Sequence, residues 1–448
     1  MIKRFSVFIY WAIMIALIAL FFTNDYGIVD IHKSAIIVAV GIDPAGEEVQ
    51  VTAQLALPQP SQSGENVQYK EVQGSGLTVA DALNEINSKT GFYPRLQFCK
   101  LILLGEGCQQ HELFRILGCF YRRNYSELTA LVAMCEGKAQ DMLAMPATVN
   151  PETYTAVQRV LSEELAKSAN VASVNLKDVA VSNYSESEAC CMPYIQASKP
   201  GTSQSGGNGD NVGGESAGGG SQSGGQSGGQ SGGQSSGQSG GQSGGQSSGQ
   251  SSGQSGGQGG GESSGQSGGS SSGQSGGEGQ PVDFTSRKTA VFTRGKFAGL
   301  LDEQQSFAYN ILKNNIRLAV LPCDSEGIHY TVGLKNTTGG VKLKVKNGVP
   351  ELTLKFKANA QIQGVKNVMR PEEVMYDDVI QKNVLRGAEK AVEERFGSLI
   401  KMCVEKDCDI LGAKELLHKY NHKYWNTFRG DLLTRMKVNY DVEIISHN

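Results

Sequence analysis

VKLKVKNGVPELTLKFKANA, residues 341–360, decides the fold of the second half of this chain. Asn347-Gly348 tolerates the positive φ values of a type I′ turn and so predicts a hairpin of two strands, 341–346 and 352–360. Because side chains alternate along a strand, one face receives apolar residues: Val341, Leu343, Val345, Leu352, Leu354 and Phe356. The other receives lysines: Lys342, Lys344, Lys346, Lys355 and Lys357. The sequence therefore predicts a sheet with one buried face and one basic face, which is a candidate contact surface.

The residues around this hairpin predict a complete mixed domain. An amphipathic helix over 371–404 carries Val384, Val392 and Phe396 on its apolar stripe, and we expect it to pack across the buried face of the sheet. The other predicted elements are a hairpin of 289–292 and 297–300 around Arg294-Gly295, helices over 302–313 and 411–419, and a last strand over 438–444. We assign residues 285–448 to a C-terminal α/β domain.

Residues 24–200 predict a second α/β domain. An apolar strand over 35–42 is expected to pair with an alternating strand over 49–57. A helix begins at the capping box of Thr78 and Asp81 and stops at Gly91. The further elements are a strand over 99–104, a helix over 111–120, a strand over 129–135 and a helix over 151–167. Their ββαβαβα order is typical of mixed α/β folds.

Between the two domains lies a segment that cannot form a core. Residues 201–280 are nearly all Gly, Ser and Gln, with no aromatic residue and with Val212 as the only branched aliphatic. Such a composition buries too little apolar surface to offset the entropy of ordering the chain. We therefore predict a disordered linker over 201–284 that separates two soluble α/β regions, or three if one of them divides further.

The N-terminus predicts a membrane anchor over residues 1–23. Residues 5–22, from Phe5 through Trp11 to Phe22, carry no charge, and a helix of this length crosses most of a hydrocarbon core. Lys3 and Arg4 precede the run, which puts the N-terminus in the cytoplasm and the domains outside. The alternative is a cleaved signal peptide, but no small residues end the run. We prefer an uncleaved transmembrane helix.

Charge is distributed unevenly along the chain, although the formal net charge is only −3. Residues 24–200 hold 13 basic and 20 acidic side chains, whereas residues 285–448 hold 26 and 19. A basic domain on a membrane-tethered protein is suited to anionic headgroups or to an acidic partner. The alternative is a solvated surface with an excess of lysine.

Patterns that carry chemistry are few. No nucleophile motif or phosphate-binding motif lies in the strand-turn-helix setting that such motifs require. We therefore expect neither an enzyme nor a cofactor. His418 and His422 have ligand-like spacing without a third ligand, so we expect no metal site. The lysine face lacks interleaved aromatic residues, which argues against nucleic acid.

The nine cysteines show no CxxC spacing, and several lie in apolar runs. This pattern is typical of small buried hydrophobic residues. The adjacent Cys190 and Cys191 are a candidate redox pair, but no basic neighbour in the sequence lowers a thiol pKa there.

Several segments, in this order and spacing, resemble one protein family. They are DIHKSAIIVAVGID (30–43), GLTVADA (76–82), KLILLGE (100–106), GKAQDML (137–143), TAVFTRGKFAGLL (289–301) and HKYNHKYW (418–425). The chain is similar through them to the Ger(x)C proteins, the C subunits of spore germinant receptors.

This resemblance implies a non-enzymatic receptor subunit in the inner spore membrane, beside integral membrane A-type and B-type subunits that sense nutrients. Two features depart from the family. No cysteine follows the apolar run for lipid attachment, and residues 201–280 are an addition. The alternative function is a membrane-tethered protein of the cell envelope whose basic C-terminal domain contacts an anionic polymer or lipid.

Overall fold

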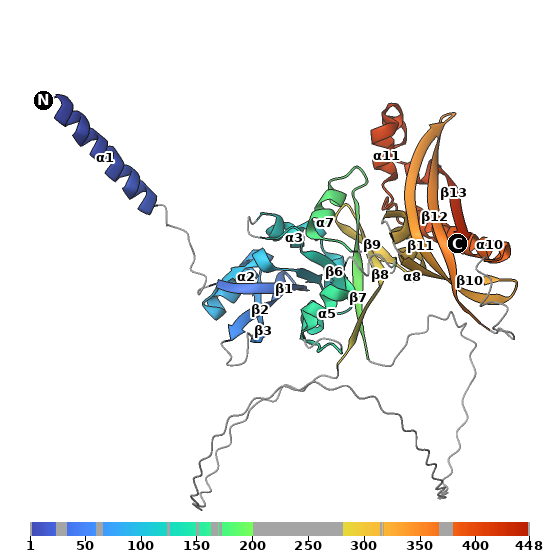
Figure 1. Ribbon diagram of the computed structural model, residues 1–448, viewed down its shortest axis with the longest axis horizontal. Coiled ribbons are helices and arrows are strands. Elements are labelled where there is room, and N and C mark those ends of the chain that lie inside the picture. The colour runs from blue at the N-terminus through green and yellow to red at the C-terminus, as the bar shows by residue number, and fades with distance from the viewer. Residues whose placement is uncertain are drawn as a thin grey trace, which may run out of the picture. The chain divides into compact units, whose positions relative to one another are not determined.

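Two β-sheets with flanking helices make up the protein, which is a mixed α+β fold as expected (Figure 1). The computed structural model describes residues 2–23, 34–59, 66–122, 126–148, 152–162, 169, 173–199, 281–313, 316, 318–366 and 380–446. Contacts between Cα positions group residues 1–202 and 279–448 into one unit and residues 203–278 into another. The second unit, and with it the predicted linker up to residue 280, lies outside the described residues.

The first sheet has nine strands among the described residues, in the order β3-β2-β1-β5-β6-β7-β8-β9, with β4 also paired to β1. The strands are β1 (Ser34–Ala45), β2 (Glu48–Gln59), β3 (Asn66–Gly76), β4 (Tyr93–Arg95), β5 (Leu101–Leu104), β6 (Leu131–Cys135), β7 (Ala189–Ser198), β8 (Asp283–Thr293) and β9 (Lys296–Leu301). The centre, β1-β5-β6-β7, is parallel, and β4 also runs parallel to β1. β2, β3, β8 and β9 pair with their neighbours in antiparallel ladders. The predicted pairing of 35–42 with 49–57 is confirmed in β1 and β2.

Helices cover both faces of this sheet. The helices are α2 (Val79–Thr90), α3 (Leu113–Arg122), α4 (Ala139–Ala144), α5 (Thr153–Val160) and α7 (Leu176–Asn183), with short 3₁₀ turns η2 (Leu96–Phe98) and η3 (Glu106–Gln110). Buried residues of α2, α3 and α7 share one core, and those of α4 and α5 share another. The predicted boundaries of α2 are confirmed, because Thr78 accepts from Asp81 N and Gly91 adopts φ 69°. The helix predicted over 151–167 is wrong at its end, since α5 stops at Val160.

The two strands on either side of the predicted linker are neighbours. β7 pairs with β8 in an antiparallel ladder from Ala189↔Thr293 to Ser198↔Asp283. β8 and β9, which the sequence assigned to the C-terminal region, therefore lie in the first sheet. The turn between them, with φ 50° at Arg294 and 72° at Gly295, is the predicted hairpin turn. Residues 199–282 are thus the connection of one long hairpin.

The second sheet has the order β10-β11-β12-β13. Its strands are β10 (Leu318–Ser325), β11 (Ile328–Lys346), β12 (Val349–Val365) and β13 (Lys437–Ser446), and its helices are α8 (Glu303–Lys313), α10 (Lys382–Glu405), α11 (Ala413–Tyr420), α12 (Trp425–Phe428) and α13 (Leu432–Arg435), with η4 (His422–Tyr424). The helix predicted from 371 begins at Lys382 in the structure, and residues 367–379 lie outside the described part. β13 runs parallel to β12, at an edge of the sheet.

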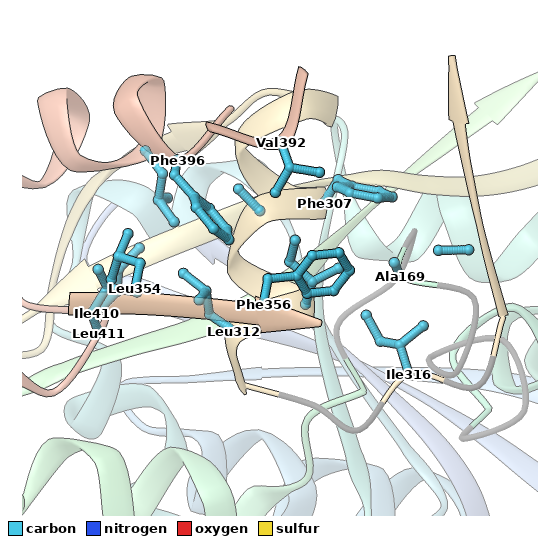
Figure 2. Packing of buried hydrophobic residues seen from close by; sticks show 14 of the residues in the cluster. Ala169, Phe307, Leu312, Ile316, Leu354, Phe356, Val392, Phe396, Ile410 and Leu411 are labelled. Atoms are coloured by element: carbon cyan, nitrogen blue, oxygen red, sulfur yellow. The ribbon is translucent and has the colours of Figure 1, made fainter. Parts of the chain in front are cut away.

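The largest core lies between the second sheet and α8 and α10. Leu354 and Phe356 of β12 pack toward Phe396 and Val392 of α10, as Figure 2 shows. The same core reaches into the first sheet through Cys191 and Val291. The two sheets therefore share buried side chains within one unit.

Candidate functional site

The lysine-bearing hairpin forms as the sequence predicts. Asn347 and Gly348 adopt φ 50° and 77°, and they join β11 to β12 with Lys346 opposite Val349. Leu343, Leu352, Leu354 and Phe356 are buried on the inner face, whereas Lys342, Lys344, Lys346 and Lys357 are exposed and Lys355 is half-buried. All five candidate lysines therefore lie on the face that points away from the core.

Acidic residues on β13 neutralise part of this face. The parallel register sets Asp441 beside Lys355 and Glu443 beside Lys357, and each pair forms an ion pair. The hydrogen bond from Lys355 lowers the pKa of Asp441, and the hydrogen bond to Glu443 raises the pKa of Lys357. Two of the five lysines, Lys355 and Lys357, thus form ion pairs within the sheet.

A third lysine, Lys346, forms an ion pair at the hairpin turn. Lys346 Nζ lies 3.0 Å from Glu351 Oε2 across the hairpin. Lys342 and Lys344, which stand opposite Thr353 and Glu351, form no ion pair with another described residue. Of the five candidate lysines, only Lys342 and Lys344, near the hairpin turn, are therefore without an ion pair to another described residue.

Residues that the sequence did not single out lie at this same end. Asn421, just after α11, donates from Nδ2 to Leu343 O over 3.4 Å. On either side of Asn421, Lys419 Nζ lies 5.2 Å from the ring centre of Tyr420, and Lys423 Nζ lies 4.6 Å from that of Tyr424. The repeated Lys-Tyr pair at 419–420 and 423–424 is a sequence signal that could have found them.

The histidine pair lies in the same segment. The rings of His418 and His422 are 4.9 Å apart between centres, and His418 is equally close to Trp425. His418 Nδ1 also lies 3.5 Å from Glu186 of the loop before β7. Among the described residues, no group of three or more His, Cys, Asp or Glu side chains is placed to hold a metal ion.

Residues 186–188 join the first sheet to the elements of the second. Ser187 Oγ donates to Asp409 Oδ2 over 2.8 Å, and Asp409 also accepts from the backbone N–H groups that begin α11, at Ala413 and Lys414. On either side, Glu186 contacts His418 and Glu188 accepts from Arg294 Nε at 3.1 Å. The position of α11 is therefore tied to the first sheet.

The cysteines behave as the buried hydrophobic residues that the sequence predicts. Eight of the nine cysteines are buried, and Cys119 is partly exposed. Burial raises the pKa of Cys190 to about 12 and raises that of Cys191 further. These adjacent residues belong to different cores, one on each side of β7.

An open cavity of about 620 Å³ lies at the carboxyl end of β1. Open α/β sheets commonly bind ligands at this end of their parallel strands. Its floor includes Ile42, Val79 and Ile116, and its charged residues are Glu47, Glu48, His111 and Arg115. Groups of both charge signs line the rim, so the cavity favours no single class of ligand.

Of the predicted membrane-span residues, Trp11 is 55% exposed on helix α1 (Ile2–Thr23), and the side chains of Phe5 and Phe22 lie outside the described part. In the portion of the chain that the structure covers, no helix combines the length and apolar character needed to cross a membrane. The span therefore stays a prediction.

Comparison with known proteins gives matches on both sides of residues 199–282. Residues 27–197 match the family model described as the spore germination protein N-terminal domain, and residues 287–447 match the one described as spore germination B3/GerAC like, C-terminal. The crystal structure of the GerBC protein is similar over 91% of this chain and 97% of that chain, with 14% identity and a TM-score of 0.47. No curated protein matches the chain.

Proposed function

Because this chain belongs to the Ger(x)C family of spore germination proteins, we propose that it is the C-type subunit of a spore nutrient germinant receptor. The observation that carries the proposal is the succession of the two family matches, 27–197 and then 287–447. Together they span both sheets, so the likeness extends to the whole described body rather than to one module.

The subunit acts by contact with other proteins rather than by catalysis. Its partners are the integral membrane A-type and B-type subunits of the receptor. The outer face of the second sheet supports this role, because it carries exposed charged side chains on three adjacent strands, β11, β12 and β13. Such faces are suited to specific recognition by complementary charges.

The subunit is held at the outer face of the inner spore membrane by α1, which crosses the membrane once. Support comes from the uncharged run of residues 5–22 and from Lys3 and Arg4 before it. A phosphatase fused after residue 448 in a bacterial host tests this arrangement. Activity of the fusion is the expected result, and an inactive but stable fusion contradicts it.

Germination of spores that lack this gene tests the function. We expect such spores to lose dipicolinic acid release in response to some nutrients, and to keep normal release under direct chemical triggers. Restoring the gene must restore the response. Unchanged responses to every nutrient, after paralogous receptor genes are also removed, would contradict the proposed role.

A further inference from the structure

Four lysines at one end of the second sheet form no ion pair with another described residue. They are Lys342 and Lys344 on β11 and Lys419 and Lys423 beside α11, all exposed. We call them the basic end. Of the acidic residues near them, Glu351 pairs with Lys346 and Asp441 pairs with Lys355, although Lys342 also helps to lower the pKa of Asp441. Glu186 and Glu415 line the same cavity as Lys419, so four lysines stand against two acidic residues outside those ion pairs. The region therefore carries excess positive charge.

One hydrogen bond brings the two pairs of lysines together. Asn421 donates to Leu343 O, Lys342 and Lys344 flank Leu343 directly, and Lys419 and Lys423 lie two residues from Asn421. Figure 1 shows α11 beside the end of β11 and β12. Since Lys342 and Lys344 point to the outer face and α11 packs on the inner side, the four charges surround the end of the hairpin.

Exposed apolar and aromatic groups accompany these charges. Val349, next to the hairpin turn, is 46% exposed, and Tyr420 is 65% exposed. Tyrosine rings and lysine side chains prefer the boundary between lipid and water, where the ring or stem is buried and the polar tip stays hydrated. The headgroup region of an anionic bilayer accommodates the lysines and the exposed apolar groups together.

We propose that the basic end docks on the anionic phosphate headgroups of a phospholipid bilayer. The surface is formed before binding, because the hairpin belongs to the sheet and the start of α11 is fixed by Asp409. Docking therefore orders few groups. This inference rests on the proposed function for the presence of a membrane. It deepens that function by assigning a partner to the basic end alone, and it leaves the rest of the outer face, on β12 and β13, for contact with proteins.

The test measures the quenching of a fluorescent dye attached beside the hairpin turn. The full chain, with Val349→Cys labelled by an environment-sensitive fluorophore and with Cys119→Ser, is reconstituted into vesicles of phosphatidylcholine, alone or mixed equally with phosphatidylglycerol. The remaining cysteines are buried, so the label goes to position 349. Quenching by headgroup nitroxide lipids reports contact with the bilayer. Lys390→Cys on α10, in the same background, is the control position for the dye.

We expect quenching at position 349 in the anionic vesicles, weaker quenching in neutral vesicles or at high salt, and little quenching at position 390. Replacing all four lysines of the basic end by glutamine should weaken the contact by about 600-fold, since each well-placed lysine contributes about fivefold and the four factors multiply. Replacing Lys177, Lys382, Lys401 and Lys406 removes the same charge elsewhere and should leave the quenching unchanged.

Three results would overturn the inference: no quenching at position 349, equal quenching in neutral and anionic vesicles, or quenching that survives the loss of the four lysines in a folded variant. The spore assay is independent of these results. If spores lose the nutrient response but the dye is not quenched, the membrane contact is rejected and the receptor role is retained. A quenched dye with normal germination keeps the membrane contact and removes the receptor role.

Discussion

Ser187 and Asp409, 222 residues apart in the sequence, form a buried hydrogen bond of 2.8 Å between the loop before β7 and the start of α11. Asp409 is only 2% exposed, so its carboxylate depends on protein donors in place of water. It receives them from Ser187 and from two backbone N–H groups of α11. This carboxylate links the two sheets.

Removing that donor should destabilise the whole unit. We expect Ser187→Ala to lower the free energy of unfolding by about 1 to 2 kcal/mol, because a buried acceptor loses one of its partners. Ser88→Ala is the control, since the Ser88 hydroxyl is exposed on α2 and bonds only to the preceding turn. Urea unfolding measures both. Equal stability of the two variants would mean that the Ser187 bond contributes nothing.

The two faces of the lysine-bearing hairpin should differ sharply in their tolerance of charge. Leu354→Asp puts a carboxylate into the core beside Phe396 and should unfold the second sheet, at a cost of several kcal/mol. Lys355→Asp, one residue later on the opposite face, should leave the protein folded, because the lost ion pair with Asp441 and the repulsion that replaces it are both exposed to solvent. Circular dichroism and limited proteolysis distinguish them. A protease-resistant Leu354→Asp protein would show that this face is not buried.

Thiol reactivity should report the buried cysteines. The thiolate is the reacting form, so a pKa of about 12 at Cys99, Cys108 and Cys190 leaves roughly one thiol in ten thousand ionised at pH 8. We expect at most one fast reaction with a disulfide reagent in the native protein, at Cys119, and all nine after unfolding in urea. The native rate at the buried sites should rise with pH. Two or more fast thiols at pH 8 would contradict this burial.

Shortening residues 201–280 should stabilise the protein. β7 and β8 are paired, so this segment closes a hairpin, and closing a shorter loop costs less entropy by about 0.6 kcal/mol for each halving. A loop of about ten Gly and Ser residues should therefore raise stability by about 2 kcal/mol. Thermal unfolding measures the change. A scrambled segment of the original length is the control, and a shortened protein that fails to fold would contradict the pairing.

Local signals in the sequence predicted much of the fold. Thr78 with Gly91, Arg294-Gly295 and Asn347-Gly348 each act within a few residues, so the boundaries of α2 and the two hairpin turns were accessible without a structure. Hydrophobic alternation then identified the buried side of β12. These elements depend on chain geometry and on burial, both of which leave a periodic pattern.

Long-range relationships left no such pattern. The neutralisation of Lys355 by Asp441 depends on the parallel pairing of β13, and pairing between distant strands is not encoded by either strand alone. The same holds for Asp43, which directly follows the strand predicted over 35–42 and lies within β1 in the structure. Its carboxylate accepts from Ala139 N and Gln140 N, over 2.8 and 2.9 Å, at the start of α4. Because Asp441 and Glu443 were not recognised as neighbours of Lys355 and Lys357, the sequence predicted a more basic face than the structure shows.

The pairing of β7 with β8 also means that chain continuity is not what holds the two parts of the protein together. A protease that cuts within residues 201–280 would produce two fragments, each carrying one strand of the same ladder. The fragments would stay associated through that ladder and through the core shared by Cys191 and Val291 with the second sheet. The intact chain and its nicked form would therefore share one fold, and a cut at this position would not release the C-terminal part.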